Sequence, residues 1–167
     1  RFNCPRPAFG QNDKTGDARI SGSLASLIGL QAALESADQD GIDKAVHHIL
    51  LLNSMIMSFG GIPLLYYGDE IGSLNDCTYL NDENKANDSR WAHRPTIDWE
   101  KAELRHQPGT VEHRIFSAVK KMIAVRKEIS AFSDFNNREL IQLDNPHLFA
   151  FSRFDLQRSS SGVLVVG

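Results

Sequence analysis

The stretch at residues 43–72, DKAVHHILLLNSMIMSFGGIPLLYYGDEIG, constrains the fold more than any other part of the chain. Residues 46–57 are apolar on nearly every side of a helix, in a run too long for a strand and too short to span a membrane. We expect a helix that begins at Asp43, is buried on most sides and ends at the glycine pair. The short apolar run at 62–67 then predicts a strand covered on both faces. A helix, a glycine turn and a buried strand in succession are typical of an α/β fold.

Other segments also have clear secondary-structure patterns. Ser21 or Ser23 can cap a helix over residues 24–37, in which apolar residues recur at helical spacing. Thr110 can cap a further helix over residues 111–129. After that helix, the runs RELIQL, HLFAFSRF and GVLVVG are separated by turn-forming residues, which predicts an antiparallel β module.

Composition and charge exclude several classes of protein. The 167 residues suffice for one domain, and a hydrophobic content of 41% suffices for a packed core. The 18 basic and 21 acidic side chains include no long basic block, which disfavours nucleic-acid binding. Cys4 and Cys77 match no metal-ligand spacing, so we expect free thiols and no metal site.

Both ends of the chain have the character of internal segments. The first residues, RFNCPRPAFGQN, contain no methionine and no signal-peptide pattern, and residues 1–18 are typical of a loop. At the other end, SGVLVVG predicts a strand whose sheet partner should follow. We therefore expect the chain to be part of a longer protein, and its localisation stays open.

Two adjacent carboxylates, Asp69 and Glu70, follow the predicted strand directly, and a long polar segment at 73–109 comes after them. In parallel α/β sheets and barrels, the loops that follow strands build the functional site. Trp91 and Trp99 argue against disorder in this segment, because large aromatic rings need packing partners. The residues alone leave two interpretations of the carboxylate pair open: catalysis, or hydrogen bonding to the backbone and pairing with an arginine.

The run GIPLLYYGDEIG resembles the eighth strand of the barrel in the α-amylase superfamily, glycoside hydrolase family 13. The run LNDENKANDSRWAHRP, at 80–95, is similar to the loop after that strand in the amylosucrase branch, and TGDARISGS, at 15–23, resembles the end of an insertion after the seventh strand. The resemblance implies an α/β fragment that is mainly helical by content. Residues 1–135 would be the last helix-strand-helix part of a TIM (β/α)8 barrel, and residues 136–167 the start of an antiparallel C-terminal β domain.

The resemblance also implies roles for individual residues. Retaining glycosidases need a nucleophilic carboxylate and a carboxylic acid about 5 Å apart, and in this family these groups follow earlier strands, so no catalytic residue is expected in this chain. Arg90 would bind substrate by closing the floor of a glucosyl pocket against an acidic residue from early in the barrel, and Arg19 would line the acceptor subsites. Loop-supporting roles are implied for Asp69, Glu70, Asp88, His93 and Arg94, although His93 could also serve as a general base.

The activity implied for the intact protein is transfer of glucose from sucrose, with retention, to an α-glucan acceptor or to water. This chain alone would be inactive. Its partners would be sugars, with no cofactor, metal, nucleic acid or membrane. The alternatives are another family 13 α-glucosidase, a sucrose hydrolase or a trehalose synthase, and, from a different class, a non-catalytic carbohydrate-binding or assembly module. Without the rest of a barrel, the apolar faces of the second helix and of residues 62–67 would be uncovered, so we expect the chain to self-associate or to rearrange its helical layer.

Overall fold

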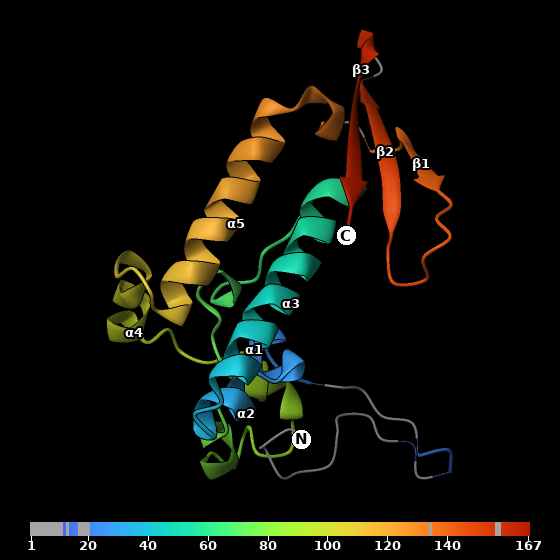
Figure 1. The fold of residues 1–167 in the computed structure, drawn as a ribbon. Helices are drawn as coiled ribbons and strands as arrows, with labels where there is room; N and C mark the ends of the chain where they lie inside the picture. The colour runs from blue at the N-terminus through green and yellow to red at the C-terminus, as the bar shows by residue number, and fades with distance from the viewer. Residues whose placement is uncertain (1–11, 13, 17–20, 134, 156–157) are drawn as a thin grey trace. The chain divides into compact units, whose positions relative to one another are not determined.

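The computed structural model describes residues 12, 14–16, 21–133, 135–155 and 158–167 (Figure 1). It contains helices and one small antiparallel sheet and is about 51% helical. This content is compatible with the predicted α/β fragment that is mainly helical. The α-helices are α1 (Leu24–Ile28), α2 (Leu30–Glu35), α3 (Gln39–Phe59), α4 (Trp99–Glu103) and α5 (Val111–Glu128), and the strands are β1 (Arg138–Ile141), β2 (Ala150–Asp155) and β3 (Arg158–Val166). Single turns of 3₁₀ helix lie at Asp69–Ile71, Thr78–Asn81, Ser89–His93, Leu104–His106 and Ser130–Phe132.

The chain divides into two compact units. The first unit comprises residues 1–49 and 66–115, and the second unit comprises residues 50–65 and 116–167. The division therefore falls within α3 and within α5. The division that the sequence predicts, near residue 135, stays a prediction.

The first helical segment is capped as predicted but is interrupted. The Ser23 hydroxyl accepts a hydrogen bond from the Ser26 backbone N–H at 3.3 Å and so caps α1. Gly29 has a left-handed backbone, with φ of 100°, and ends α1 before α2 begins. Glycine adopts this conformation without the steric penalty of a side chain, so the expected continuous helix over residues 24–37 is wrong.

Helix α3 begins at Gln39, earlier than the expected Asp43, because the Asp38 carboxylate accepts a hydrogen bond from the Gly41 N–H at 3.0 Å. It ends, as predicted, at the glycine pair, where Gly60 and Gly61 both have positive φ. The expected burial on most sides is wrong, because the helix buries one face and leaves large apolar side chains exposed on the other. The buried face includes Ile42, Val46, Ile49, Asn53 and Met57, and the exposed apolar side chains are Leu51, Leu52 and Ile56.

Residues 62–67 do not form the predicted strand. Their backbone belongs to no strand of the sheet that the described residues build, and Ile62 and Leu64 are 82% and 80% exposed. A strand requires ladder partners for its N–H and C=O groups, and a doubly covered strand requires a layer on each face. The expected buried strand is therefore wrong in this structure.

The last helix and the sheet follow the sequence prediction. The Thr110 hydroxyl accepts a hydrogen bond from the His113 N–H at 3.1 Å and caps α5. In the second unit the strands lie side by side in the order β1-β2-β3, and both pairs are antiparallel (Figure 1). Phe151 pairs with Leu140 on one side and Val165 on the other, and its ring meets the Phe59 ring edge-on at 5.2 Å. The predicted antiparallel module after α5 is confirmed.

Two further findings concern the cysteines and membranes. Cys77 is disulfide-bonded, so the expectation of a free thiol at this position is wrong, and the other cysteine of the sequence, Cys4, lies outside the described residues. Over the part of the chain that the structure describes, no helix has both the length and the apolar character needed to cross a membrane.

Candidate functional site

The candidate site lies at residues 66–95, in the first unit. Gly68 and Gly72 flank the turn Asp69–Ile71 and have positive φ angles of 90° and 66°. A Cβ on Gly68 would come within 2.6 Å of the Ser73 hydroxyl oxygen, and one on Gly72 within 2.7 Å of the Ile115 Cδ1. Only glycine fits both the conformation and the space, so the carboxylates of the GDE run are held in one tight turn.

Asp69 and Glu70, which the sequence places side by side, have different surroundings. The Glu70 carboxylate accepts a hydrogen bond from the Gly68 N–H at 2.8 Å and so holds the turn from within. Burial, followed by the negative charge of Glu70, raises the pKa of Asp69. Asp69 therefore retains its proton at a higher pH than an ordinary aspartate, and its side chain lines a cavity described below.

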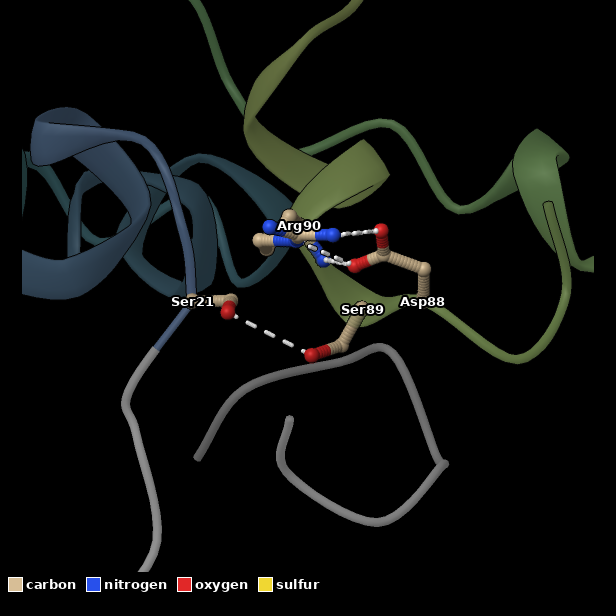
Figure 2. Close-up of polar contacts among 4 residues, drawn as sticks. All are labelled: Ser21, Asp88, Ser89 and Arg90. Carbon is tan, nitrogen blue, oxygen red and sulfur yellow. Dashed lines mark hydrogen bonds and ion pairs between the residues drawn. The ribbon is translucent and has the colours of Figure 1, made fainter. Parts of the chain in front are cut away.

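Arg90, the expected substrate-binding residue, is paired within its own loop (Figure 2). Its Nε donates to both carboxylate oxygens of Asp88, at 2.8 and 3.0 Å, and its Nη2 donates to Oδ2 at 2.6 Å. These side-chain hydrogen bonds, together with one from the Arg90 backbone N–H, lower the pKa of Asp88 to about 2. Arg90 was expected to pair with an acidic residue from elsewhere in a barrel, whereas Asp88 lies two positions before it.

The loop is tied to the start of α1 by polar contacts that the sequence did not reveal. The Asn75 side-chain oxygen accepts a hydrogen bond from the Ser23 N–H at 2.7 Å, and the Asn75 N–H donates to the Ser26 hydroxyl at 2.8 Å. Figure 2 shows a further contact, in which the Ser89 hydroxyl donates to the Ser21 hydroxyl at 3.3 Å. Asparagine and serine are common in loops, so nothing in the residue types distinguished these positions from the other polar residues of 73–109.

His93 and Arg94, which are neighbours in the WAHR run, have different surroundings. The Arg94 guanidinium lies 5.6 Å from the centre of the Trp91 ring, and the Lys85 ammonium lies 5.1 Å from it, both within the range of cation–π attraction. Burial, followed by the positive charge of Arg94, lowers the pKa of His93, so its ring is neutral at pH 7. The His93 Nδ1 is buried and has no hydrogen-bond partner among the described residues. Trp99, by contrast, is 72% exposed.

A cavity of about 150 Å³ brings two of the expected loop residues together. Asp69 and His93, which are far apart in the sequence, both line it, together with Tyr66, Tyr67 and Ser73. The tyrosine rings lie 4.5 Å apart between centres. Sequence reasoning missed both tyrosines because it assigned them to a buried strand.

The remaining candidate residues do not join this cluster. Glu70, Asp88, Arg90 and Arg94 are not among the residues that line the cavity, and Arg19 lies outside the described residues. Within the described ranges, no group of three or more His, Cys, Asp or Glu side chains is arranged to hold a metal ion. No family model matches the chain.

Proposed function

We propose that this chain is the C-terminal part of an amylosucrase-like α-glucan glucosyltransferase of the α-amylase superfamily. The observation that carries the proposal is the run LNDENKANDSRWAHRP, which is similar to the loop after the eighth barrel strand of amylosucrases. The folded loop supports it, because Asp88 orients the Arg90 guanidinium through a two-pronged contact. A fixed guanidinium plane suits recognition of a carboxylate or of vicinal hydroxyls.

The exposed side chains of the segment at 62–67 support a place in a larger barrel. The segment is not part of the sheet, and Ile62 and Leu64 are exposed side chains of the kind that flanking layers of a barrel would cover. In the intact protein, this segment would be the eighth strand, with α3 and α5 as the seventh and eighth helices. Residues 1–135 would then complete the barrel, and residues 136–167 would begin the C-terminal β domain.

In this proposal the chain contributes binding and not covalent chemistry. Retention requires a carboxylate nucleophile. In the family that the chain resembles, this nucleophile follows an earlier barrel strand, and the chain resembles only later parts of the barrel. Arg90 would close the glucosyl pocket and Arg19 would line the acceptor subsites. A guanidinium carries five N–H donors, so a carboxylate from the barrel could share Arg90 with Asp88.

Sucrose turnover tests the proposal. The intact protein and, separately, this chain would be incubated with sucrose alone while glucose, fructose and insoluble glucan are followed over time. We expect the intact protein to release fructose well in excess of free glucose, because glucose is transferred to glucan, and the chain alone to release neither.

Each other outcome has a definite meaning. Equimolar glucose and fructose would identify a sucrose hydrolase. Turnover of maltose, and not of sucrose, would point to a trehalose-forming isomerase, because trehalose contains two glucose units and no fructose. Turnover by this chain alone would overturn the assignment of chemistry to the rest of the protein. Absence of turnover by the intact protein, with retained sugar binding, would favour a non-catalytic carbohydrate-binding module.

The same proposal accounts for the uncovered apolar surface. Leu51, Leu52 and Ile56 on α3 are exposed, as are Ile62 and Leu64 after it, and surfaces of this kind drive association in water. We therefore expect this chain on its own to self-associate. Light scattering that gives the mass of a monomer, at concentrations at which the chain stays folded, would contradict this expectation.

A further inference from the structure

The cavity lined by Tyr66, Tyr67, Asp69, Ser73 and His93, called here the tyrosine cavity, combines an aromatic surface with convergent polar groups. The two tyrosine rings are inclined by 39° with centres 4.5 Å apart, and their residues are 41% and 47% exposed. The Tyr67 hydroxyl donates to the Pro95 carbonyl at 3.2 Å, which anchors that ring to the end of the loop. An exposed aromatic pair, anchored at one hydroxyl, offers a firm apolar face to a ligand.

One residue that lines the cavity has a polar atom without a hydrogen-bond partner among the described residues. Buried polar atoms in folded proteins are nearly always hydrogen-bonded, so an exception calls for a bound molecule or water. The His93 Nδ1 is such an exception within the described residues, and the His93 side chain lines the cavity. Asp69 adds a carboxyl group that is partly withdrawn from water, since burial is the main cause of its raised pKa.

The charge of the lining indicates which class of ligand fits. The described residues that line the cavity include one carboxylate and no lysine or arginine, which disfavours an anion. They also lack the three clustered ligands that a metal ion would require. A neutral hydroxylated molecule suits the lining, because a carboxyl and a neutral imidazole can both exchange hydrogen bonds with hydroxyl groups.

The size of the cavity limits the ligand further. Sites for drug-sized ligands typically enclose about 300–1,000 Å³, whereas this cavity encloses about 150 Å³. One ring with hydroxyl groups fills such a space, and an oligosaccharide does not. A pyranose also carries C–H groups on its faces, which can lie against a tyrosine ring while the hydroxyls at its edge meet polar groups.

We propose that the tyrosine cavity binds one neutral sugar ring, with Tyr66 and Tyr67 supplying the stacking surface and Asp69 and His93 accepting and donating hydrogen bonds to its hydroxyls. The choice of a glucose-type ring rests on the proposed function, whereas the polar and aromatic lining is a property of the cavity itself. The cavity is distinct from the Asp88–Arg90 pair, whose side chains do not line it.

Nuclear magnetic resonance of the 167-residue chain tests this site. Methyl α-D-glucopyranoside would be titrated into the labelled chain while the ring signals of its histidines are followed. We expect the His93 signal to shift in a saturable way, with a dissociation constant on the order of millimolar, as is usual for a single small polar ring. The signal of His106, an exposed histidine outside the cavity, should stay in place.

Variants separate binding from folding. We expect Tyr66→Ala and Asp69→Asn to weaken binding at least about tenfold, one by removing a ring and the other by removing the charged acceptor. Tyr66→Phe keeps the ring and should bind nearly as well as the original chain. Circular dichroism would verify that each variant folds, and Asp69→Asn, which preserves shape, keeps the test valid if Tyr66→Ala does not.

The outcomes distinguish this inference from the proposed function. A His93 signal that the sugar does not move, or that moves equally with glycerol, would overturn the sugar site and assign the unpartnered nitrogen to water. An equal affinity in all variants would overturn it as well. Sucrose turnover by the intact protein without a response at His93 would refute the site alone, whereas a saturable response without sucrose turnover would refute the proposed enzyme alone.

Discussion

Two arginines in the two units show how differently the same side chain can be used. In the second unit, Arg153 is fully buried on β2, where its Nε donates to the Asn137 side-chain oxygen at 2.7 Å and its Nη1 donates to the Ser58 carbonyl at 2.5 Å. In the first unit, Arg90 makes an ion pair with Asp88 at 2.6 Å, yet its side chain is 46% exposed. The buried contacts must replace water completely, whereas the exposed pair competes with water at every moment. We therefore expect the buried Arg153 to stabilise the fold more than the exposed Arg90 does.

The surroundings of Arg153 extend this contrast. Its guanidinium lies 5.6 Å from the centre of the Phe132 ring, and its partner Asn137 donates to the Ala131 carbonyl at 2.8 Å and to the Phe154 carbonyl. One buried side chain therefore links β2 to the end of α3, through Ser58, and, through Asn137, to the turn that precedes β1. Networks of this kind are costly to break because every remaining member is left buried.

The largest effect is expected at Arg153. Replacing it with alanine leaves the Asn137 oxygen and the Ser58 carbonyl buried without these donors, at a cost of about 1–3 kcal/mol each, and the cavity that it opens adds to the loss. Urea-induced unfolding followed by circular dichroism would measure the loss. The matched control is Arg138→Ala, since Arg138 lies opposite Arg153 in the β1-β2 pair but is only half-buried. A loss at Arg153 no larger than that at Arg138 would remove the basis of the comparison.

The two arginines also show what the sequence could and could not predict. The caps at Ser23 and Thr110, the end of α3 and the antiparallel strands depend on local chemistry, and they were predicted. Arg153 was missed, although it lies two residues after the buried Phe151 in β2 and therefore points to the same face of the sheet. Period-two alternation could have revealed it, but a charged residue in a strand is ordinarily taken to face water.

The segment at 62–67, most of which belongs to the second unit, and the candidate site in the first unit were harder to predict because their structures depend on distant partners. The strand expected at 62–67 needs neighbours that the described residues do not supply, and the tyrosine cavity joins Asp69 to His93 across a loop. The resemblance directed attention to both residues as supports of the loop, and to Arg90 as a binding residue. It could not indicate that Asp88 would be the partner of Arg90, since pairing between near neighbours depends on the local backbone at Ser89–His93.

An intermediate effect is expected at Asn75, which ties the loop to α1 in the first unit. Asn75→Ala removes the acceptor for the Ser23 N–H, and Ser23 is 8% exposed, so a buried donor loses its partner at a cost of about 1–3 kcal/mol. Asn75→Asp retains an acceptor at the same place and should retain most of the stability. Differential scanning calorimetry of both variants would test whether polar contacts in the first unit also matter once they are buried. Equal losses in the two variants would mean that the acceptor is not what stabilises this contact.

Replacing Asp69 is expected to change the stability by a smaller amount and to increase it. Its pKa is raised in the folded chain, so ionisation at neutral pH opposes folding, and the opposition disappears as the pH falls below the ordinary aspartate value of about 3.9. We expect Asp69→Asn to raise the unfolding temperature at about pH 7 and to have little effect at about pH 3. The same variant should bind the sugar ring less well, so stability and binding would change in opposite directions. An unfolding temperature that is lower at both pH values would show instead that the ionised carboxylate stabilises the fold.

The smallest effect on stability is expected at the Asp88–Arg90 pair, although its effect on titration is large. Because both side chains are accessible to water, Arg90→Ala should leave the urea midpoint nearly unchanged, as should Arg105→Ala, which removes another arginine paired with an acidic residue two positions away, Glu103. The pKa of Asp88, about 2 in the original chain, should rise toward its ordinary value in Arg90→Ala, and carboxyl nuclear magnetic resonance would record this change. Since the pKa is depressed by folding, any stability that the pair supplies is present above about pH 4 and is lost as the pH falls toward 2. A large change in the urea midpoint without a change in the pKa of Asp88 would mean that Arg90 stabilises the loop through contacts other than Asp88. The difference between Arg90 and Arg153 would then lie in their partners and not in their burial.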